Sequence, residues 1–292
     1  MTRTFQVDWI SVFRRAATSG KRAILRNYNF ENRVKVVKRG VGGDLTLEID
    51  EVSEHAIYES LKRDLGEDLF VFVSEELGEI KPQKGSEPLP VVICDPLDGS
   101  HNAQVGIPFF AVSLSVIVGT AKTQTLPRTF GNVGAGFVLS VKTNDEYFAR
   151  KGTGAFHDGV KLKPRTWAPP RAETLLVETG DVDFLREKLI SNLSKKEVYK
   201  IRVLGSAALS YCLLADGSAD GLIFAQPGGG ARTIDSPAGY LIAREAGCVF
   251  ADLSGKYLYI DRVEVGFHSK IDLIGASNSK MLTRLKRSVH LP

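Results

Sequence analysis

Apolar side chains recur at helical spacing in two stretches near the start of the chain. Over residues 7–27 they alternate with basic residues, which predicts an amphipathic helix interrupted near Gly20. Over residues 49–65 the spacing returns, with acidic residues in the first turn, where the helix dipole favours negative charge. The pattern therefore predicts two helices on the surface of the core.

Short apolar runs of strand character follow, and helical spacing returns in the last third. The predicted strands span residues 70–73, 91–94, 111–118, 136–141, 147–150, 221–225 and 248–251. The predicted later helices span residues 183–194, 205–216 and 235–246. A proline-rich break near residue 165 predicts an N-terminal α+β subdomain over 1–165 and a C-terminal α/β subdomain over 166–292. Residues 119–133 are predicted to form a surface loop that could act as a lid.

Composition places the chain among ordinary globular proteins, with 292 residues of which 43% are hydrophobic and 25% charged. The formal charge of +4 is small and dispersed, so no nucleic-acid polymer is expected as a partner. Cys94, Cys212 and Cys248 stand far apart in apolar surroundings, which indicates reduced core residues. We expect no membrane partner and a cytoplasmic location, because no signal-like or membrane-length apolar run occurs.

The run Asp-Pro-Leu-Asp-Gly-Ser at residues 95–100 carries the strongest chemical signal. Asp95 and Asp98 come directly after a strand-like apolar run, and burying two unpartnered carboxylates there would be costly. A cation is the expected compensation. Glu75 and Glu76 follow the preceding strand, and adjacent strands lie about 4.8 Å apart. All four acids could therefore converge.

Three further aspartates leave alternatives open. Asp235 stands where a helix is predicted to begin, so it serves either as the N-cap or as a metal ligand. Asp44 and Asp50 present the same ambiguity near the start of the second helix. The glycine-rich stretch 228–232 reads as a flexible loop or as part of a pocket wall.

Together these motifs resemble those of the lithium-sensitive, magnesium-dependent phosphatase superfamily, and the chain is similar to inositol monophosphatases. The sequence pattern of this superfamily consists of two glutamates, then D-P-[IL]-D-G-[TS], then a distant helix that begins D-x-[AS]-[AP]-[AG]. It is present at residues 75–76, 95–100 and 235–238. Supporting matches at 151–159, 204–209 and 245–247 extend the resemblance over nearly the whole chain.

The resemblance implies a layered α-β-α-β-α sandwich of the sugar phosphatase type, with two subdomains and usually a homodimer. It implies two or three Mg²⁺ ions, for which hard oxygen ligands are suited. The implied metal ligands are Glu75, Asp95, the carbonyl of Leu97, Asp98 and Asp235. The implied catalytic residues are Asp50, Glu75 and Ser100, of which Asp50 and Ser100 orient and help deprotonate the attacking water. Backbone N–H groups of Gly99 and Ser100 would bind phosphate, and the candidate sugar-side contacts are Arg202, Gly205, Ser206 and Ala207.

The implied reaction is Mg²⁺-dependent hydrolysis of a sugar or inositol phosphate monoester, without a phosphoenzyme. Microbial relatives that the chain resembles act on both fructose 1,6-bisphosphate and inositol 1-phosphate. Phe224 occupies the position of an inositol-binding glutamate in the animal enzymes, and an aromatic ring cannot accept those hydrogen bonds. Ile234 replaces the usual tryptophan. Two alternatives stay open: a 3′(2′),5′-bisphosphate nucleotidase, and a catalytically silent regulatory protein that binds metal and sugar phosphate.

Overall fold

The computed structural model describes residues 7–41, 45–82, 89–118, 127–163, 173–179, 183, 199–225, 230–253 and 260–288. The helices are α1 (Trp9–Asn27), α2 (Phe30–Val34), α3 (Glu48–Leu65), α4 (Ser100–Val105), α7 (Ala207–Ala215), α8 (Pro237–Glu245) and α9 (Ser279–Ser288). Short 3₁₀ turns are η1 (Glu67–Leu69), η2 (Phe130–Asn132) and η4 (Ile260–Arg262). The strands are β1 (Val36–Arg39), β2 (Leu45–Leu47), β3 (Val71–Ser74), β4 (Gly78–Ile80), β5 (Val91–Asp98), β6 (Ala111–Ile117), β7 (Val133–Ser140), β8 (Glu146–Arg150), β9 (Gly154–His157), β10 (Val160–Lys161), β11 (Glu173–Glu178), β12 (Tyr199–Arg202), β13 (Gly221–Phe224), β14 (Ala231–Arg232), β15 (Val249–Ala251), β16 (Lys270–Ile271) and β17 (Leu273–Ala276).

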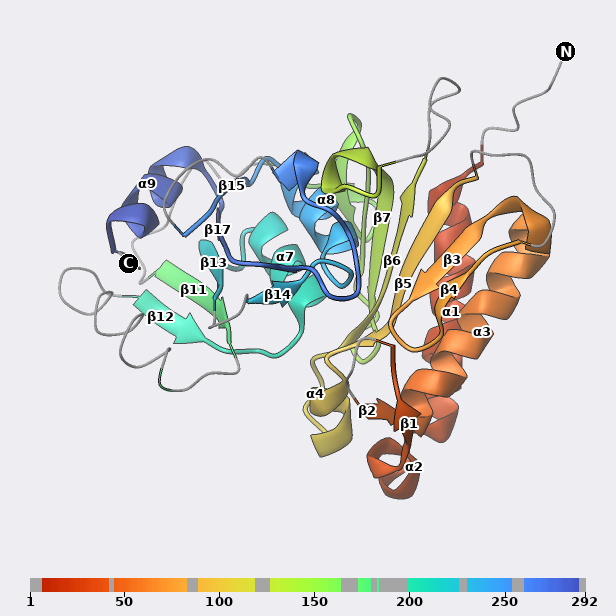
Figure 1. Ribbon diagram of the computed structural model, residues 1–292. Coiled ribbons are helices and arrows are strands. Elements are labelled where there is room, and N and C mark those ends of the chain that lie inside the picture. The colour runs from red at the N-terminus through yellow and green to blue at the C-terminus, as the bar shows by residue number, and fades with distance from the viewer. Residues whose placement is uncertain are drawn as a thin grey trace, which may run out of the picture.

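These elements form five layers, which Figure 1 shows from right to left. Helices α1 and α3 cover one face of an eight-stranded sheet, and α7 and α8 cover its other face. A five-stranded sheet packs beyond α7, and α9 covers its outer face. The expected α-β-α-β-α sandwich is confirmed.

The large sheet has the strand order β10-β9-β8-β7-β6-β5-β3-β4 and is antiparallel except for the parallel pair β3 and β5. The smaller sheet has the order β12-β11-β13-β17-β15, with β12, β11 and β13 parallel. The large sheet draws its strands from before residue 165 and the smaller one from after it. The subdomain boundary itself lies outside the described residues and stays a prediction.

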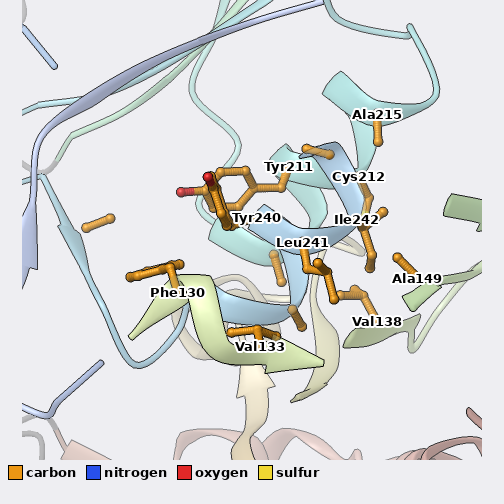
Figure 2. Packing of buried hydrophobic residues seen from close by; sticks show 14 of the residues in the cluster. Phe130, Val133, Val138, Ala149, Tyr211, Cys212, Ala215, Tyr240, Leu241 and Ile242 are labelled. Atoms are coloured by element: carbon orange, nitrogen blue, oxygen red, sulfur yellow. The ribbon is translucent and has the colours of Figure 1, made fainter. Parts of the chain in front are cut away.

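Both faces of the large sheet are buried, which explains why its strands read as unbroken apolar runs. In β5, Val91 and Ile93 face the cluster under α7 and α8, whereas Val92 and Cys94 face the cluster under α1 and α3. Figure 2 shows the first of these clusters, where side chains of α7 and α8 meet those of the sheet. This alternation fixes the register of the strand, because a slip of one residue would exchange the two faces.

Helix α1 is continuous, so the predicted interruption near Gly20 is wrong. A Cβ at Gly20 would lie 2.7 Å from Cγ1 of Ile57 and 2.9 Å from the Oγ of Ser53, both in α3. The glycine therefore serves close packing of two helices and does not break one. The N-cap of the helix is Asp8, whose carboxylate accepts a hydrogen bond from the Ser11 amide at 3.5 Å.

One other expectation changes in the middle of the chain, and another stays a prediction. Within the predicted loop 119–133, residues 127–133 contain η2 and the start of β7. Phe130 is buried, and its ring packs edge-on against Tyr240 with centroids 5.2 Å apart. Residues 119–126 and nearly all of the predicted helix 183–194 lie outside the described residues.

The three cysteines are free and buried, as predicted. Within the described ranges, the structure has no helix of the length and apolar character that a membrane span requires.

Candidate active site

Two neighbouring parallel strands bring the first acids to one edge of the large sheet. Ser74 of β3 pairs in register with Cys94 of β5, so Glu75 and Asp95 leave the same end of the sheet. Strand β5 continues to Asp98, four residues beyond the predicted end, with a register irregularity against β6 between Asp95 and Asp98. Pro96 has no N–H for the strand ladder and lies within this irregularity, which turns both aspartates toward the pocket.

Asp235 reaches the same pocket from the other side of the fold. The N-cap of α8 is Ser236, so the interpretation of Asp235 as that cap is wrong. Glu75, Asp95 and Asp235 each place one oxygen within 4.8 Å of the others. Acids distant in the chain are thus gathered at one point.

The pocket has a volume of about 310 Å³ and combines both halves of the chain. All of the predicted metal and phosphate residues line it. The lining residues are Val36, Leu45, Leu47, Glu75, Glu76, Asp95, Leu97, Asp98, Gly99, Ser100, His101, Gln104, Gly205, Arg232 and Asp235.

Burial makes the charged forms of these carboxylates costly. It raises the pKa of Asp95 well above its usual range, and the nearby charges of Glu75 and Asp235 raise it further. Burial and the Asp235 charge raise the pKa of Glu75 in the same way. Burial raises the pKa of Asp98 to about 6, although the Ser206 hydroxyl opposes the shift by donating to its carboxylate. The buried carboxylates of the pocket are therefore not fully compensated by positive charge from the protein.

Asp50 does not itself line the pocket, but it contacts Ser100, which does. The Ser100 Oγ lies 3.1 Å from Oδ1 of Asp50 and 2.8 Å from the carbonyl oxygen of Leu97. The amide of Leu47 donates to the other Asp50 oxygen at 2.7 Å, which fixes the carboxylate at the first turn of α3. Burial raises the pKa of Asp50 to about 7. This pair is positioned to hold and accept a proton near neutral pH.

Gly99 makes the turn between β5 and α4. Its φ of +91° is a left-handed conformation that favours glycine. A Cβ there would lie 3.0 Å from the carbonyl oxygen of Phe109 and 3.1 Å from that of Gly205. The turn therefore lets the two halves of the chain approach closely beside Ser100.

Asp98 is bound to the first turn of α7. Its carboxylate accepts hydrogen bonds from the Ser206 hydroxyl, from the Ala207 amide at 3.1 Å and from the Ala208 amide at 2.9 Å. Of the predicted sugar-side residues, Gly205 lines the pocket, whereas Ser206 and Ala207 reach it through Asp98. Asp98 thus joins the large sheet to a helix of the second half.

Arg202 and Phe224, both singled out in the sequence, neither line the pocket nor bond to a residue that does. Arg202 is exposed at the end of β12, and its guanidinium donates to the neighbouring carbonyl of Ile201 at 2.8 Å. Phe224 is 1% exposed and packs against the ring of Tyr211, with centroids 5.1 Å apart. Direct contact of Phe224 with a substrate is therefore excluded in this arrangement. Asp44 lies outside the described residues.

The stretch 228–232 was interpreted as a flexible loop or as part of a pocket wall, and its last residue, Arg232, does line the pocket. The contacts of Arg232 with the acids were not predicted. Its guanidinium Nη2 lies 2.6 Å from Oε1 of Glu75, and its Nε lies 2.8 Å from Oδ2 of Asp235.

Glu178 was also missed, because nothing in its sequence context marks it. It lies buried at the end of β11 and accepts hydrogen bonds from the Gly205 amide at 3.0 Å and the Ser210 hydroxyl at 2.6 Å. From the opposite side, the Asn102 amide nitrogen donates to the carbonyl of Leu204 at 2.6 Å. The turn that leads into α7 is therefore held by side chains from both halves.

The Glu178→Gln variant should remove part of the pH dependence of stability. Burial raises the pKa of Glu178 from 4.5 to about 7. Between these values the folded protein binds more protons than the unfolded chain, so this group makes stability fall as pH rises. Glutamine does not titrate; its amide oxygen can accept from the Gly205 amide, and its amide nitrogen can donate to the Ser210 hydroxyl. As pH rises through this range, the free energy of unfolding of wild type should fall by about 3 kcal/mol relative to that of the variant.

Urea unfolding of both proteins at about pH 5 and about pH 8.5, in EDTA, measures this difference. Equal pH slopes for the two proteins would show that Glu178 does not titrate as described.

The donor set suits a hard divalent cation. Carboxylate oxygens and a backbone carbonyl are the ligands that such ions bind. The four acids are buried, and burial raises the pKa of Glu75, Asp95 and Asp98. Arg232 already shows that the cluster attracts positive charge. Glu75, Asp95, Asp98 and Asp235 are the residues that would hold the ion.

This layered fold and its acidic pocket are those of a phosphoric monoester hydrolase. A sequence model of the inositol monophosphatase family matches residues 6–290. The chain therefore belongs to the inositol monophosphatase family, which is generally metal-dependent and acts on small phosphate esters.

Individual relatives agree with this assignment. The chain is 30% identical over 280 residues to an Archaeoglobus fulgidus protein named fructose-1,6-bisphosphatase/inositol-1-monophosphatase, covering 95% of this chain and 96% of the relative. It is 27% identical to a Methanococcus maripaludis bifunctional NADP phosphatase/NAD kinase, covering 88% of this chain and 44% of that protein. A solved inositol monophosphatase-fructose 1,6-bisphosphatase superposes with a TM-score of 0.75 at 25% identity, covering 97% of this chain and all of the other.

Proposed function

We propose that the protein hydrolyses the phosphate monoester of a sugar or inositol, with fructose 1,6-bisphosphate and inositol 1-phosphate as its substrates. The observation that carries this proposal is the convergence of buried carboxylates beside the Asp50 and Ser100 pair. The names of archaeal relatives that align over nearly the whole chain support the substrate class. The resemblance also supports a homodimer.

We propose Mg²⁺ as the cation, held by Glu75, Asp95, Asp98 and Asp235 together with the carbonyl of Leu97. When bound, Mg²⁺ would neutralise charge on the phosphate and acidify the attacking water. The chain positions that water through Ser100, whose hydroxyl lies between Asp50 and the Leu97 carbonyl. Asp50 accepts the proton, because its pKa of about 7 lets it gain and lose a proton at neutral pH.

Backbone N–H groups of Gly99 and Ser100 provide the phosphate contacts in this proposal. The left-handed turn at Gly99 brings the start of α4 to the pocket wall. Asp98 and Gly205 also line the pocket, and hydroxyl groups of the substrate would bind beside them. Attack by water at phosphorus would then break the bond to the ester oxygen, release the alcohol, which takes up a proton, and give inorganic phosphate without a phosphorylated side chain.

A second candidate is a phosphatase acting on a nucleotide. The specific observation in its favour is the relative named bifunctional NADP phosphatase/NAD kinase, whose match covers 88% of this chain. A 3′(2′),5′-bisphosphate nucleotidase would use the same acidic pocket. The two candidates differ in the group that carries the phosphate, so they are separable by substrate.

Initial rates of phosphate release from four compounds test the proposal: fructose 1,6-bisphosphate, inositol 1-phosphate, phosphoadenosine phosphate and NADP. Each is measured with Mg²⁺ and with EDTA. We expect the first two to be preferred and EDTA to abolish release, because the buried carboxylates need a cation to bind a phosphate dianion.

Dominant rates on either nucleotide would select the second candidate. Binding of Mg²⁺ and sugar phosphate without any release would instead indicate a regulatory protein.

A further inference from the structure

Arg232 occupies the acidic pocket as a cation supplied by the chain itself. It contacts Glu75 at 2.6 Å and Asp235 at 2.8 Å, and the three side chains are only 20%, 11% and 12% exposed. A guanidinium stays charged at all accessible pH values, and hydrogen bonds between charged groups are strong ones. Two of the acids that would hold a metal are therefore already neutralised in part.

The backbone of this segment is held independently of the guanidinium. Arg232 belongs to β14 and pairs with Lys270 of β16. Its carbonyl accepts a hydrogen bond from the Ser236 hydroxyl at 3.2 Å, and the next amide, of Thr233, donates to Ser269 at 2.8 Å. The long side chain can therefore change rotamer while the backbone that carries Asp235 stays in place.

A divalent cation would need the same oxygens that Arg232 now contacts. Oε1 of Glu75 and Oδ2 of Asp235 accept from the guanidinium, and two cations that share carboxylates in a buried site repel each other. We infer that Arg232 is an exchangeable counterion: it binds Glu75 and Asp235 in the metal-free protein and releases them to the incoming cation. This inference rests on the proposed metal-dependent function.

The exchange has two consequences. First, the affinity of the pocket for metal is set by competition, so Arg232 weakens binding relative to a neutral side chain. Second, the metal-free pocket is stabilised, because without Arg232 the acids lose their nearest positive charge. Arg232 is thus a positioning residue that acts through Glu75 and Asp235, and it lines the pocket where a phosphate would lie after the exchange.

The test measures metal affinity in the absence of substrate. Purified metal-free Arg232→Gln is titrated with Mn²⁺ by isothermal calorimetry beside wild type. We expect Mn²⁺ to bind the variant about tenfold more tightly, equivalent to 1.4 kcal/mol. In EDTA the melting temperature of the variant should fall by several degrees, and Mn²⁺ should raise it more than it raises that of wild type.

Two further variants make the result specific. Arg128→Gln removes the same charge from an ion pair with Glu79 outside the pocket, so its Mn²⁺ affinity should equal that of wild type. Arg232→Lys keeps a positive charge but loses the planar fork, so its Mn²⁺ affinity should fall between those of wild type and Arg232→Gln. It also provides a folded variant if Arg232→Gln is too unstable to purify.

Unchanged or weaker Mn²⁺ binding by both Arg232 variants would overturn the inference. So would an equal gain in affinity for Arg128→Gln, which would indicate a general charge effect. The proposed function is judged separately by phosphate release from wild type. If wild type releases no phosphate but Arg232→Gln binds Mn²⁺ more tightly, the exchange stands and the proposed reaction fails.

Discussion

Asp95→Asn should reduce phosphate release by about 10³-fold, because the lost carboxylate removes several kcal/mol of metal-dependent stabilisation of the transition state. Asp95 lies within 4.8 Å of both Glu75 and Asp235 through its ligand oxygen, so the variant weakens the whole cation site. The measurement is the initial rate of phosphate release with saturating Mg²⁺ and substrate. Asparagine has almost the same shape as aspartate, so the loss reports charge and ligation and not packing.

The same variant should make the metal-free protein more stable. Burial, then the charges of Glu75 and Asp235, raise the pKa of Asp95 well above its usual range, so an ionised Asp95 is costly near neutral pH. Asparagine removes that charge and keeps the acceptor oxygen for the Leu97 amide, which donates to Asp95 at 3.0 Å. In EDTA at neutral pH we expect the free energy of unfolding to rise by about 1–3 kcal/mol.

Asp64→Asn is the matched control. It removes one negative charge from an ion pair with Arg15 that does not line the pocket. Its rate should equal that of wild type, and its stability should change by no more than about 1 kcal/mol. An Asp95→Asn rate within tenfold of wild type would reject the assigned role of Asp95, and a less stable metal-free variant would reject the electrostatic argument.

Helices and strands with strong periodicity were predictable from the sequence. Helix α3 and strand β6 lie within one residue of their predicted bounds, because each buries a continuous face. Strands β11 and β17 were not predicted. Strand β17 spans four residues and carries Gly275, so its own strand propensity is weak, and it pairs with β13 and β15. Strand β11 spans six residues and pairs with β12 and β13.

The gathering of the acids was also predictable in part, because Glu75 and Asp95 follow adjacent strands. Their roles as ligands stay predictions. The contact of Arg232 with Glu75 and that of Glu178 with Gly205 could not be predicted, since each joins segments far apart in the chain, and an isolated Arg or Glu most often lies on the surface. Gly20 was misinterpreted for the same reason: it is needed because α3 packs closely against α1 at that position, and it does not interrupt α1.

Asp98 is both a proposed metal ligand and a hydrogen-bond acceptor for α7, so the Asp98→Asn variant should behave differently from Asp95→Asn. Its carboxylate accepts from the Ser206 hydroxyl and from the amides of Ala207 and Ala208. Asparagine offers one acceptor oxygen, and its amide nitrogen would face an N–H donor. The variant also removes the negative charge that the N-terminus of α7 favours.

We therefore expect Asp98→Asn to lose both activity and stability. The rate of phosphate release should fall by about 10²–10³-fold, since a proposed metal ligand is lost. The free energy of unfolding should fall by about 1–3 kcal/mol, because a buried amide of α7 loses its partner. The expected change in the free energy of unfolding thus has the opposite sign to that of Asp95→Asn, although both variants replace a buried carboxylate of the same pocket.

Comparing the stabilities of Asp95→Asn and Asp98→Asn in EDTA separates the effect of charge in the pocket from the support that Asp98 gives to α7. Charge repulsion alone would make both variants more stable than wild type, whereas the contacts of Asp98 predict that only Asp95→Asn gains stability. Ser206→Ala removes one donor to Asp98 without changing any charge, so it should lose stability in the same direction as Asp98→Asn while retaining the acids. If urea unfolding gives Asp98→Asn the stability of wild type or more, the first turn of α7 does not depend on this carboxylate, and Asp98 acts in the pocket only.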